Sequence, residues 1–184
     1  MKDLIERIDA LLARNEQVIV AIDGNCAAGK TTLAGRLAEH YDCNVLHMDD
    51  FFLRPEQRTP ERLAEPGGNI DYERFEAEVL IPLAKGLPFT YRPYDCTTQT
   101  LGAPIPLPQK AVTVIEGSYS LHPRFRNYYD LKILLEISAE SQRKRLQHRN
   151  PSLYERFLKE WIPMEETYFK ETDIEKCCDI RRTL

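Results

Sequence analysis

The sequence predicts an α/β fold in which a parallel sheet of about five strands is flanked by helices. Short apolar runs such as 18–22, 111–115 and 131–137 have the length of buried strands. They alternate with longer segments in which apolar residues recur at helical spacing. Strands that alternate with helices are typical of a parallel sheet covered on both faces. The 184 residues suit a single domain, 1–184, with a sizeable core.

The first third of the chain carries the clearest alternation. Leu4, Ile8 and Leu11 share one helical face and predict a helix over 3–14. The pieces that follow are a strand over 17–23, a helix over 30–40 and a strand over 43–48. Proline, glycine and charged residues dominate 54–70, which predicts a loop.

The next segments depart from this rhythm. Apolar residues at helical spacing predict a helix over 71–85, which Pro82 is expected to bend or shorten and Gly86 to stop. Five prolines and alternating aromatic residues mark 87–109, which predicts an irregular β-hairpin protruding from the sheet. The remaining predicted pieces are strands over 111–115 and 131–137, a helix over 139–149 capped by Ser138, helical segments near 151–170 and a strand over 178–182.

One motif predicts a ligand. The pattern G-x-x-x-x-G-K-[ST] is matched at every fixed position by Gly24-Asn25-Cys26-Ala27-Ala28-Gly29-Lys30-Thr31. A strand precedes this run and a helix that includes Thr32 follows it, so a chance match is the weaker interpretation. The backbone N–H groups of such a loop and the start of the helix form an anion site. We therefore predict a P-loop NTPase fold that binds a nucleoside triphosphate, with Lys30 at the β- and γ-phosphates and the Thr31 hydroxyl on Mg²⁺.

Three carboxylates end predicted strands at the same edge of the sheet. Asp49 and Asp50 follow the second strand, and Glu116 follows an apolar strand, where an acid without a partner is costly to bury. Phosphoryl transfer needs carboxylates near Mg²⁺ and beside the attacking hydroxyl. Because side chains alternate along a strand, Asp49 and Asp50 are not both expected to face the nucleotide. The alternatives are a cap or turn role for one aspartate and a solvated strand end for Glu116.

The predicted helix over 139–149 is rich in arginine. Its arginines are Arg143, Arg145 and Arg149, and the last two share one face. A lid over 139–160 would bring their guanidinium groups to the transferring phosphate. A solvated basic face is the alternative.

Composition limits the class of partner. A net charge of −4 gives no global basic surface for nucleic acid, and no apolar stretch approaches the roughly 20 residues of a membrane span. The five cysteines are odd in number and not spaced for a metal, and the N-terminal residues lack a secretory apolar core. These features predict a cytoplasmic protein with reduced thiols. His47 and Trp161 are expected to have packing roles.

The ordered motifs resemble those of the uridine kinase and phosphoribulokinase family of P-loop kinases. The resemblance spans 17–182, and its pieces are the phosphate loop, Asp49-Asp50-Phe51-Phe52, Asn69-Ile70-Asp71-Tyr72, Tyr91-Arg92-Pro93-Tyr94-Asp95, Val114-Ile115-Glu116-Gly117 and the arginine-rich helix. In this family ATP phosphorylates a primary hydroxyl, usually the 5′-hydroxyl of a nucleoside. The resemblance therefore implies a kinase that uses ATP and Mg²⁺ on a small nucleoside-like substrate, and it allows for a homo-oligomer.

The resemblance also implies the roles of the residues around the phosphate. Asp49 would accept the proton of the hydroxyl and lie near Mg²⁺, with Thr31 and Glu116 as the other groups around the metal. Arg145 and Arg149 would contact phosphate from the lid.

The acceptor is where the family pattern weakens. The resemblance implies that Asp71 binds sugar hydroxyls and that Tyr94 lines the substrate pocket. Uridine and cytidine kinases tend to carry an aromatic residue and a histidine where this chain has Cys96 and Gln99. Gln99 can still hydrogen-bond a base edge, whereas Cys96 cannot stack on one. A kinase for nicotinamide riboside, pantothenate or another alcohol therefore stays open, as does a non-catalytic nucleotide-binding module.

Overall fold

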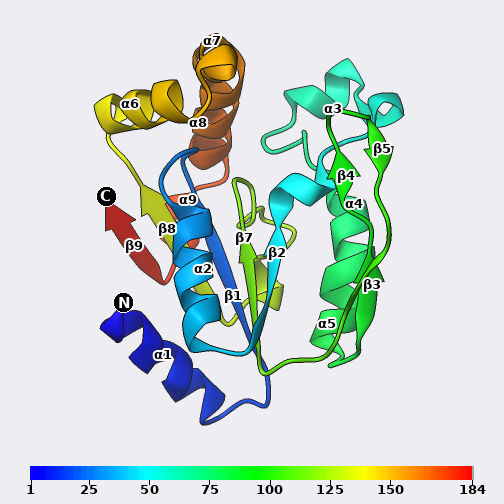
Figure 1. Cartoon of the computed structure of the whole chain (residues 1–184), viewed down its shortest axis with the longest axis vertical. Coiled ribbons are helices and arrows are strands. Elements are labelled where there is room, and N and C mark those ends of the chain that lie inside the picture. The colour runs from blue at the N-terminus through cyan, green and yellow to red at the C-terminus, as the bar shows by residue number, and fades with distance from the viewer. Residues whose placement is uncertain (184) are drawn as a thin grey trace.

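A five-stranded parallel sheet lies at the centre of the structure, a computed structural model that describes residues 1–183 (Figure 1). The strands are β1 (Val18–Gly24), β2 (Cys43–His47), β7 (Val112–Glu116), β8 (Leu131–Glu136) and β9 (Ile180–Thr183). Their order across the sheet is β2-β7-β1-β8-β9, and every neighbouring pair is parallel. The predicted α/β class and the five-stranded sheet are therefore confirmed.

Helices cover both faces of the sheet because the strands bury side chains on both sides. One face packs against α1 (Lys2–Leu12) and α2 (Lys30–His40), and the other against α4 (Tyr72–Phe75), α5 (Ile81–Ala84), α8 (Ile162–Glu171) and α9 (Ile174–Cys177). Along β1, Val18, Val20 and Ile22 belong to the first apolar cluster, whereas Ile19 and Ala21 belong to the second. This is the two-residue period of a strand.

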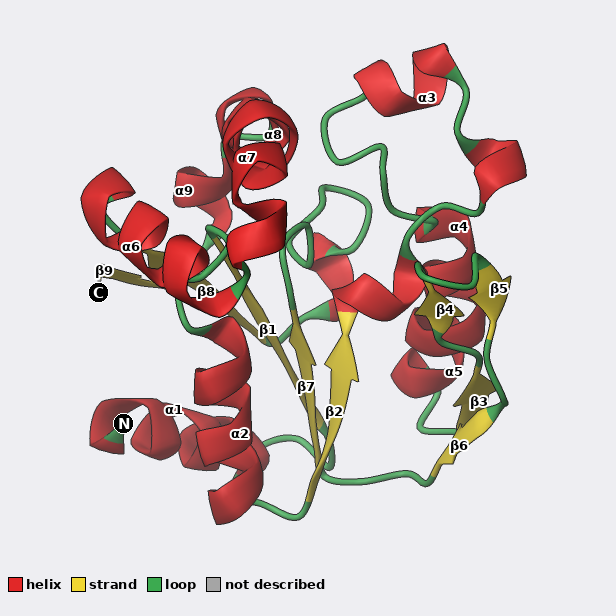
Figure 2. Cartoon of the chain, turned by 45° about the horizontal axis from the view of Figure 1, so that its top comes forward, coloured by secondary structure: helices red, strands yellow, loops and turns green. Residues whose placement is uncertain are grey.

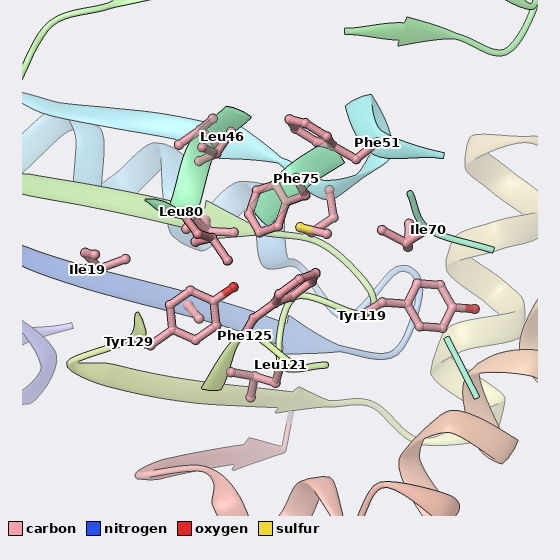
Figure 3. Packing of buried hydrophobic residues seen from close by; sticks show 14 of the residues in the cluster. Ile19, Leu46, Phe51, Ile70, Phe75, Leu80, Tyr119, Leu121, Phe125 and Tyr129 are labelled. Carbon is pink, nitrogen blue, oxygen red and sulfur yellow. The ribbon is translucent and has the colours of Figure 1, made fainter. Parts of the chain in front are cut away.

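Aromatic rings fill the cluster on the second face (Figure 3). Phe75 packs edge-on against Phe51 and Phe125, with ring centroids 4.8 and 4.9 Å apart, and all three rings are fully buried. Such pairs add roughly 0.5–1.5 kcal/mol beyond the burial of their area. Because Phe51 closely follows β2, this packing also fixes the polar residues beside it at the carboxyl edge of the sheet.

The segment 72–84 is one continuous helix that runs through Pro82. A proline inside a helix clashes with the carbonyl group four residues earlier. A π-helical turn over Glu76–Leu80 precedes Pro82, and a second π-helical turn over Phe157–Trp161 precedes Pro163 in α8. We infer that each wide turn moves the obstructing carbonyl aside, so that the proline is accommodated without breaking the helix.

The segment 54–70, predicted to be a loop, contains two short helices. A 3₁₀ helix spans Pro55–Gln57, and α3 spans Pro60–Ala64. The Thr59 hydroxyl accepts a hydrogen bond from the backbone N–H of Arg62 at 3.2 Å, which caps α3. A proline at the first helical position suits this geometry. The loop prediction was wrong at α3 because the cap and the proline there act as a helix start rather than as breakers.

The segment 87–109 leaves the main sheet and lies beside α4 and α5 (Figure 2). It forms two short antiparallel ladders, in which β3 (Phe89–Tyr91) pairs with β6 (Ile105–Leu107) and β4 (Tyr94–Asp95) pairs with β5 (Thr100–Leu101). The Tyr91 hydroxyl donates to Asp50 Oδ2 at 2.9 Å. The hairpin predicted from the prolines is thus present, and this bond ties it to the segment that follows β2.

Three helical segments stand over the carboxyl ends of the strands (Figure 1). They are α6 (Ala139–Arg149), α7 (Tyr154–Arg156) and the beginning of α8. Ser138 caps α6 as predicted, since its hydroxyl accepts from the backbone N–H of Ser141 at 3.2 Å. Among the described residues, no helix is both long enough and apolar enough to cross a membrane.

Candidate active site

The phosphate loop connects β1 to α2 through backbone conformations that few residues tolerate. Gly24 has a φ of 140° and Gly29 a φ of 95°. A Cβ atom at Gly24 would lie 1.9 Å from the carbonyl oxygen of Leu135 in β8. Only glycine fits there. The resulting bend brings the N-terminus of α2 to the carboxyl edge of the sheet, where a helix attracts anions.

A cavity of about 770 Å³ lies between this loop, the segment after β2, the end of β7, α6, the π turn Phe157–Trp161 and α8. Six of the nine residues predicted to hold the nucleotide line it, namely Cys26, Ala27, Gly29, Lys30, Thr31 and Thr32. Gly24, Asn25 and Ala28 do not line it, and Ala28 is fully buried in the apolar cluster with α2. The loop therefore faces the cavity from Cys26 onward, except at Ala28.

Lys30 points its ammonium group back along the loop. Its Nζ donates to the carbonyl oxygens of Gly24 and Asn25, at 2.6 and 2.9 Å, and to the hydroxyl of Ser118 at 3.2 Å. Because these acceptors are neutral, they hold the Lys30 ammonium group beside the anion site and leave its positive charge available to a ligand. The arrangement suits a ligand with phosphate groups.

Glu116 joins two strands and the loop. Its Oε1 accepts from the Thr31 hydroxyl at 3.0 Å and lies 2.6 Å from Nδ1 of His47, its partner in the register of β2 and β7. The hydrogen bond to this carboxylate raises the pKa of His47 above its ordinary value. The packing role expected for His47 was wrong. The contact depends on the pairing of β2 with β7, which no local pattern in the sequence gives.

Asp49 lines the cavity and Asp50 does not. Both lie in a 3₁₀ helix over Met48–Phe51 that follows β2. The Asp49 side chain is open to the water of the cavity, yet the surrounding protein desolvates it enough to raise its pKa above its ordinary value. Asp50 instead accepts from Tyr91. The two side chains do face apart, but a 3₁₀ turn rather than strand alternation separates them, because the strand ends at His47.

Three of these oxygen groups suit a magnesium ion. The Thr31 hydroxyl and the Asp49 and Glu116 carboxylates all line the cavity, and Mg²⁺ prefers such ligands together with substrate phosphates. Residues 1–183 contain no group of three or more histidine, cysteine, aspartate or glutamate side chains placed to hold a metal. The protein therefore offers the partial set of ligands that Mg²⁺ typically uses when phosphates complete it.

The helix α6 contributes arginine side chains to the cavity and a hydrogen bond to the phosphate loop. Arg145 and Arg149 line the cavity, as the lid prediction requires, whereas Arg143 does not. Arg145 Nη1 donates to the carbonyl oxygen of Ala27 at 3.0 Å, so α6 is attached to the loop itself. Both arginines are exposed.

Asp23 is a buried acid that was not predicted to have a role. Its Oδ1 accepts from the N–H groups of Gly24 and Tyr119, at 2.6 and 3.2 Å, and its Oδ2 from the N–H of Leu121 and the hydroxyl of Tyr168, both at 2.8 Å. Burial raises the pKa of Asp23 to about 6 in spite of these four donors. Its position in an apolar run was a usable signal, because an acid there needs partners.

Glu165 of α8 is a second buried carboxylate that the sequence did not reveal. It accepts from the backbone N–H of Cys26 at 2.9 Å and from the Ser118 hydroxyl at 2.5 Å. From α6, Gln142 Nε2 donates to the carbonyl oxygen of Cys26 at 3.1 Å. Two helices therefore grip the phosphate loop at one residue, a contact that depends on the tertiary fold and has no local pattern.

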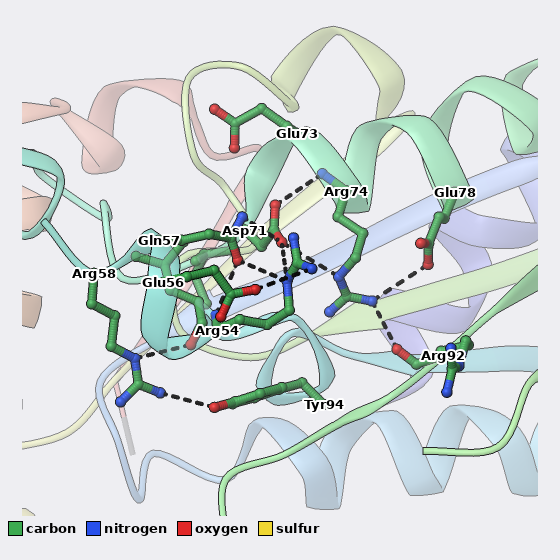
Figure 4. A network of polar contacts seen from close by, with 12 residues as sticks. Arg54, Glu56, Gln57, Arg58, Asp71, Glu73, Arg74, Glu78, Arg92 and Tyr94 are labelled. Carbon is green, nitrogen blue, oxygen red and sulfur yellow. Dashed lines mark hydrogen bonds and ion pairs between the residues drawn. The ribbon is translucent and has the colours of Figure 1, made fainter. Parts of the chain in front are cut away.

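The three residues predicted only for the acceptor do not line the cavity. The buried Asp71 carboxylate caps the helix at Tyr72, accepts from Gln57 Nε2 at 2.9 Å and lies 3.6 Å from Arg74 Nε (Figure 4). Tyr94 is buried and its hydroxyl accepts from Arg58 at 3.3 Å. Gln99 is exposed in the hairpin turn, with a φ of 57°. Roles for Asp71, Tyr94 and Gln99 in acceptor binding stay predictions.

The cavity is also lined by aromatic and polar residues outside the phosphate loop. They are Phe52, Asn69, Cys96, Tyr119, Phe157 and Trp161. Trp161 lies edge-on to Phe157 with ring centroids 4.5 Å apart, which agrees with the packing role expected for it. Trp161 also lines the cavity, which that expectation did not include. Cys96 is the residue through which the hairpin lines the cavity. Aromatic rings, an amide and a thiol suit a small organic ligand.

A strand, a glycine-bounded loop ending in Lys-Thr, a following helix and strand-end carboxylates define the P-loop NTPase fold. No protein-family model matches the chain. The chain is 29% identical over 139 residues to uridine kinase of Anoxybacillus flavithermus, and the match covers 69% of this chain and 64% of that protein. The chain thus spans less than two thirds of this relative's length.

Solved structures share the fold over nearly the whole chain. A possible uridine kinase from Bacillus stearothermophilus has a TM-score of 0.68 at 21% identity, with 97% of this chain and 98% of that chain covered. D-glycerate 3-kinase from Cryptococcus neoformans has a TM-score of 0.60 at 13% identity, with 91% and 85% covered. The P-loop NTPase fold is confirmed, and with the sequence match the chain resembles uridine kinase-like P-loop kinases.

Proposed function

We propose that this protein transfers the γ-phosphate of ATP to a hydroxyl group of a small molecule, most simply the 5′-hydroxyl of a nucleoside. One observation carries this proposal. The carboxylate of Asp49 lines the same cavity as Lys30 and the hydrogen-bonded pair of Thr31 and Glu116. A phosphate-binding loop beside a free carboxylate is the arrangement that hydroxyl phosphorylation needs.

Each group has a distinct task in this proposal. Asp49 holds the acceptor hydroxyl by a hydrogen bond and takes its proton, a task that its raised pKa favours. Lys30 leaves the loop carbonyls for the phosphates. Thr31 and Glu116 would hold Mg²⁺ with Asp49, and the ion would supply positive charge that offsets the charge of the phosphates.

The lid arginines complete the charge balance. Arg145 and Arg149 reach the cavity from α6, and guanidinium groups bind phosphate oxygens in pairs. Because phosphoryl transfer spreads negative charge over the equatorial oxygens, such donors stabilise the transition state more than the ground state. The lid also covers the cavity and so limits the access of water.

Replacement of Asp49 tests the proton acceptor. Asp49→Asn keeps the shape of the side chain but cannot take a proton, so we expect turnover to fall by about 10²–10⁴-fold. Mg²⁺-dependent ATP binding, measured by calorimetry, should stay within a few-fold of the wild type, since the loop is intact. Asp50→Asn is the matched control and should retain turnover, because Asp50 faces the Tyr91 hydroxyl. Near-normal turnover of Asp49→Asn would contradict the assignment.

A panel of acceptors tests the substrate. Uridine, cytidine, nicotinamide riboside, pantothenate and simple alcohols are offered with Mg²⁺-ATP, and ADP is measured by a coupled assay. Turnover of uridine or cytidine far above the others supports a nucleoside kinase. A preference for another alcohol would change the proposed acceptor but leave the proposed phosphoryl transfer in place. Tight nucleotide binding without transfer to any hydroxyl would reject the kinase in favour of a regulatory module.

A further inference from the structure

Glu165 is a buried carboxylate beside an anion site, which is an unfavourable place for negative charge. It lines the cavity, and only 4% of its surface is exposed. A ligand with phosphate groups in the same cavity would be repelled by it. Such a residue is expected only where its hydrogen bonds do something that a neutral side chain cannot do.

The two oxygens of Glu165 hold two different parts of the site. Oε2 accepts from the N–H of Cys26 in the phosphate loop at 2.9 Å. Oε1 accepts from the Ser118 hydroxyl at 2.5 Å, a short distance typical of a bond to an ionised group. Both donors lie on the loops that form the cavity floor, so one carboxylate sets their separation.

Ser118 passes this contact to Lys30. Its hydroxyl donates its only hydrogen to Glu165 and is therefore left to accept from Lys30 Nζ, which lies 3.2 Å away. The hydrogen bonds thus run in one direction, from the ammonium through the hydroxyl to the carboxylate. An anion at the end of such a chain fixes the orientation of the hydroxyl and draws the ammonium toward it.

Glu165 also stands one helical turn after Trp161, on the same face of the helix. Trp161 also lines the cavity. The helix therefore contributes both an aromatic ring and a carboxylate that binds the phosphate loop.

We propose that Glu165 is a positioning residue that orients Lys30 through Ser118 and fixes the loop at Cys26 for phosphoryl transfer. This inference deepens the proposed function and rests on it. Gln at position 165 carries no charge, and with its carbonyl oxygen on the Cys26 N–H its NH₂ group would donate to the Ser118 hydroxyl, so the chain of hydrogen bonds from Lys30 would no longer end on an anion. Lys30 would then be free to adopt orientations that bind the phosphates without supporting their transfer.

The test compares Glu165→Gln with Glu166→Gln, the exposed neighbour on the same helix. We expect Glu165→Gln to lower the rate of phosphoryl transfer about tenfold or more, the effect of losing a hydrogen bond to a charged group. Its affinity for the non-hydrolysable analogue AMP-PNP with Mg²⁺, measured by calorimetry, should be unchanged or higher, because a repelling charge is gone. Glu166→Gln should match the wild type in both.

Ser118→Ala supplies the second variant. Because Ser118 and Glu165 act in series on Lys30, the double variant should transfer phosphate no more slowly than the slower single variant. Additive losses would overturn the proposal, as would a Glu165→Gln variant that is as fast as Glu166→Gln. A loss of analogue binding that parallels a fall in melting temperature would also overturn it, since that pattern indicates a structural contact only.

Hydrolysis of ATP by water, measured without an acceptor, separates this inference from the proposed function. Lys30 supports transfer of the γ-phosphate to water as well as to an alcohol. A wild type that hydrolyses ATP but phosphorylates no alcohol rejects the proposed function, and the variants still decide the role of Glu165. A wild type that binds the analogue and does neither rejects both.

Discussion

At the scale of single residues, two buried acids that no motif contains hold the site together. Asp23 binds the first N–H of the phosphate loop, two N–H groups after β7 and the hydroxyl of Tyr168 in α8. It therefore joins three segments that are far apart in the sequence. Its carboxylate faces donors only, which requires an acceptor with all of its lone pairs available.

Replacement of Asp23 should destabilise the fold. In Asp23→Asn, an amide NH₂ meets at least one buried donor, so we expect a loss of about 1–3 kcal/mol in the free energy of unfolding at pH 7.5. Denaturation in urea measures it. Phosphate transfer by the folded fraction should also fall, because the carboxylate that joins Gly24 to the segment after β7 loses one of its two acceptor oxygens.

The same pair of proteins predicts a dependence on pH. Because burial raises the pKa of Asp23 to about 6, the folded state binds a proton more readily than the unfolded chain between about pH 4 and 6. The wild type therefore gains stability as the pH falls through this window and loses it as the pH rises. The asparagine variant lacks this titration, so the difference between the two should widen from pH 7 to pH 4. A difference that narrows would show that the four donors outweigh burial.

At the scale of elements, sequence patterns predicted the features that depend on interactions between residues close together in the chain. The phosphate loop, the sheet, the cap at Ser138 and the proline-rich hairpin were all visible in the sequence. The contacts of Glu165 with Cys26 were not, because residues about 140 positions apart meet only in the fold. The acceptor roles of Asp71, Tyr94 and Gln99 stay predictions, and these residues do not line the cavity. A hairpin pattern indicates which residues alternate, but not which of them the lid encloses.

The hairpin offers a prediction about the acceptor. Cys96 lines the cavity and Gln99 does not. We expect Cys96→Phe to supply a ring on which a base can stack and so to lower the KM for uridine or cytidine about tenfold, a gain of roughly 1.4 kcal/mol of binding. The KM for ATP should stay unchanged. Gln99→Ala is the matched control in the same turn, and an equal effect there would mean that the hairpin closes over the ligand.

At the scale of the whole molecule, charge is distributed unevenly. The chain carries a net charge of −4, yet four cationic side chains line the cavity, namely Lys30, Lys144, Arg145 and Arg149. Attraction of a polyanion to this site is therefore a local effect. Local attraction between exposed charges is screened by salt, because the Debye length is only about 10 Å at 0.1 M.

Salt should therefore affect the KM for ATP and the KM for an uncharged acceptor differently. Between about 50 mM and 500 mM potassium chloride, we expect the KM for ATP to rise several-fold, while the KM for an uncharged nucleoside stays constant. An anionic acceptor such as pantothenate would instead follow ATP. Arg149→Ala should reduce the salt dependence for ATP, and Arg143→Ala, which changes an arginine outside the cavity, should not. A KM for ATP that ignores salt would show that these cations do not reach the phosphates.

The π-helical turns before Pro82 and Pro163 each place one extra residue in a helix. A π turn contains one residue more than the α-helical pattern allows, so the residues before and after it face as though one had been inserted. Each residue of an α-helix turns by about 100°. Phe157 and Trp161 are the first and last residues of the π turn before Pro163, and both line the cavity. Removal of one residue from this turn would restore regular α-helical spacing and return a carbonyl group to the proline ring, so the extra residue and Pro163 depend on each other.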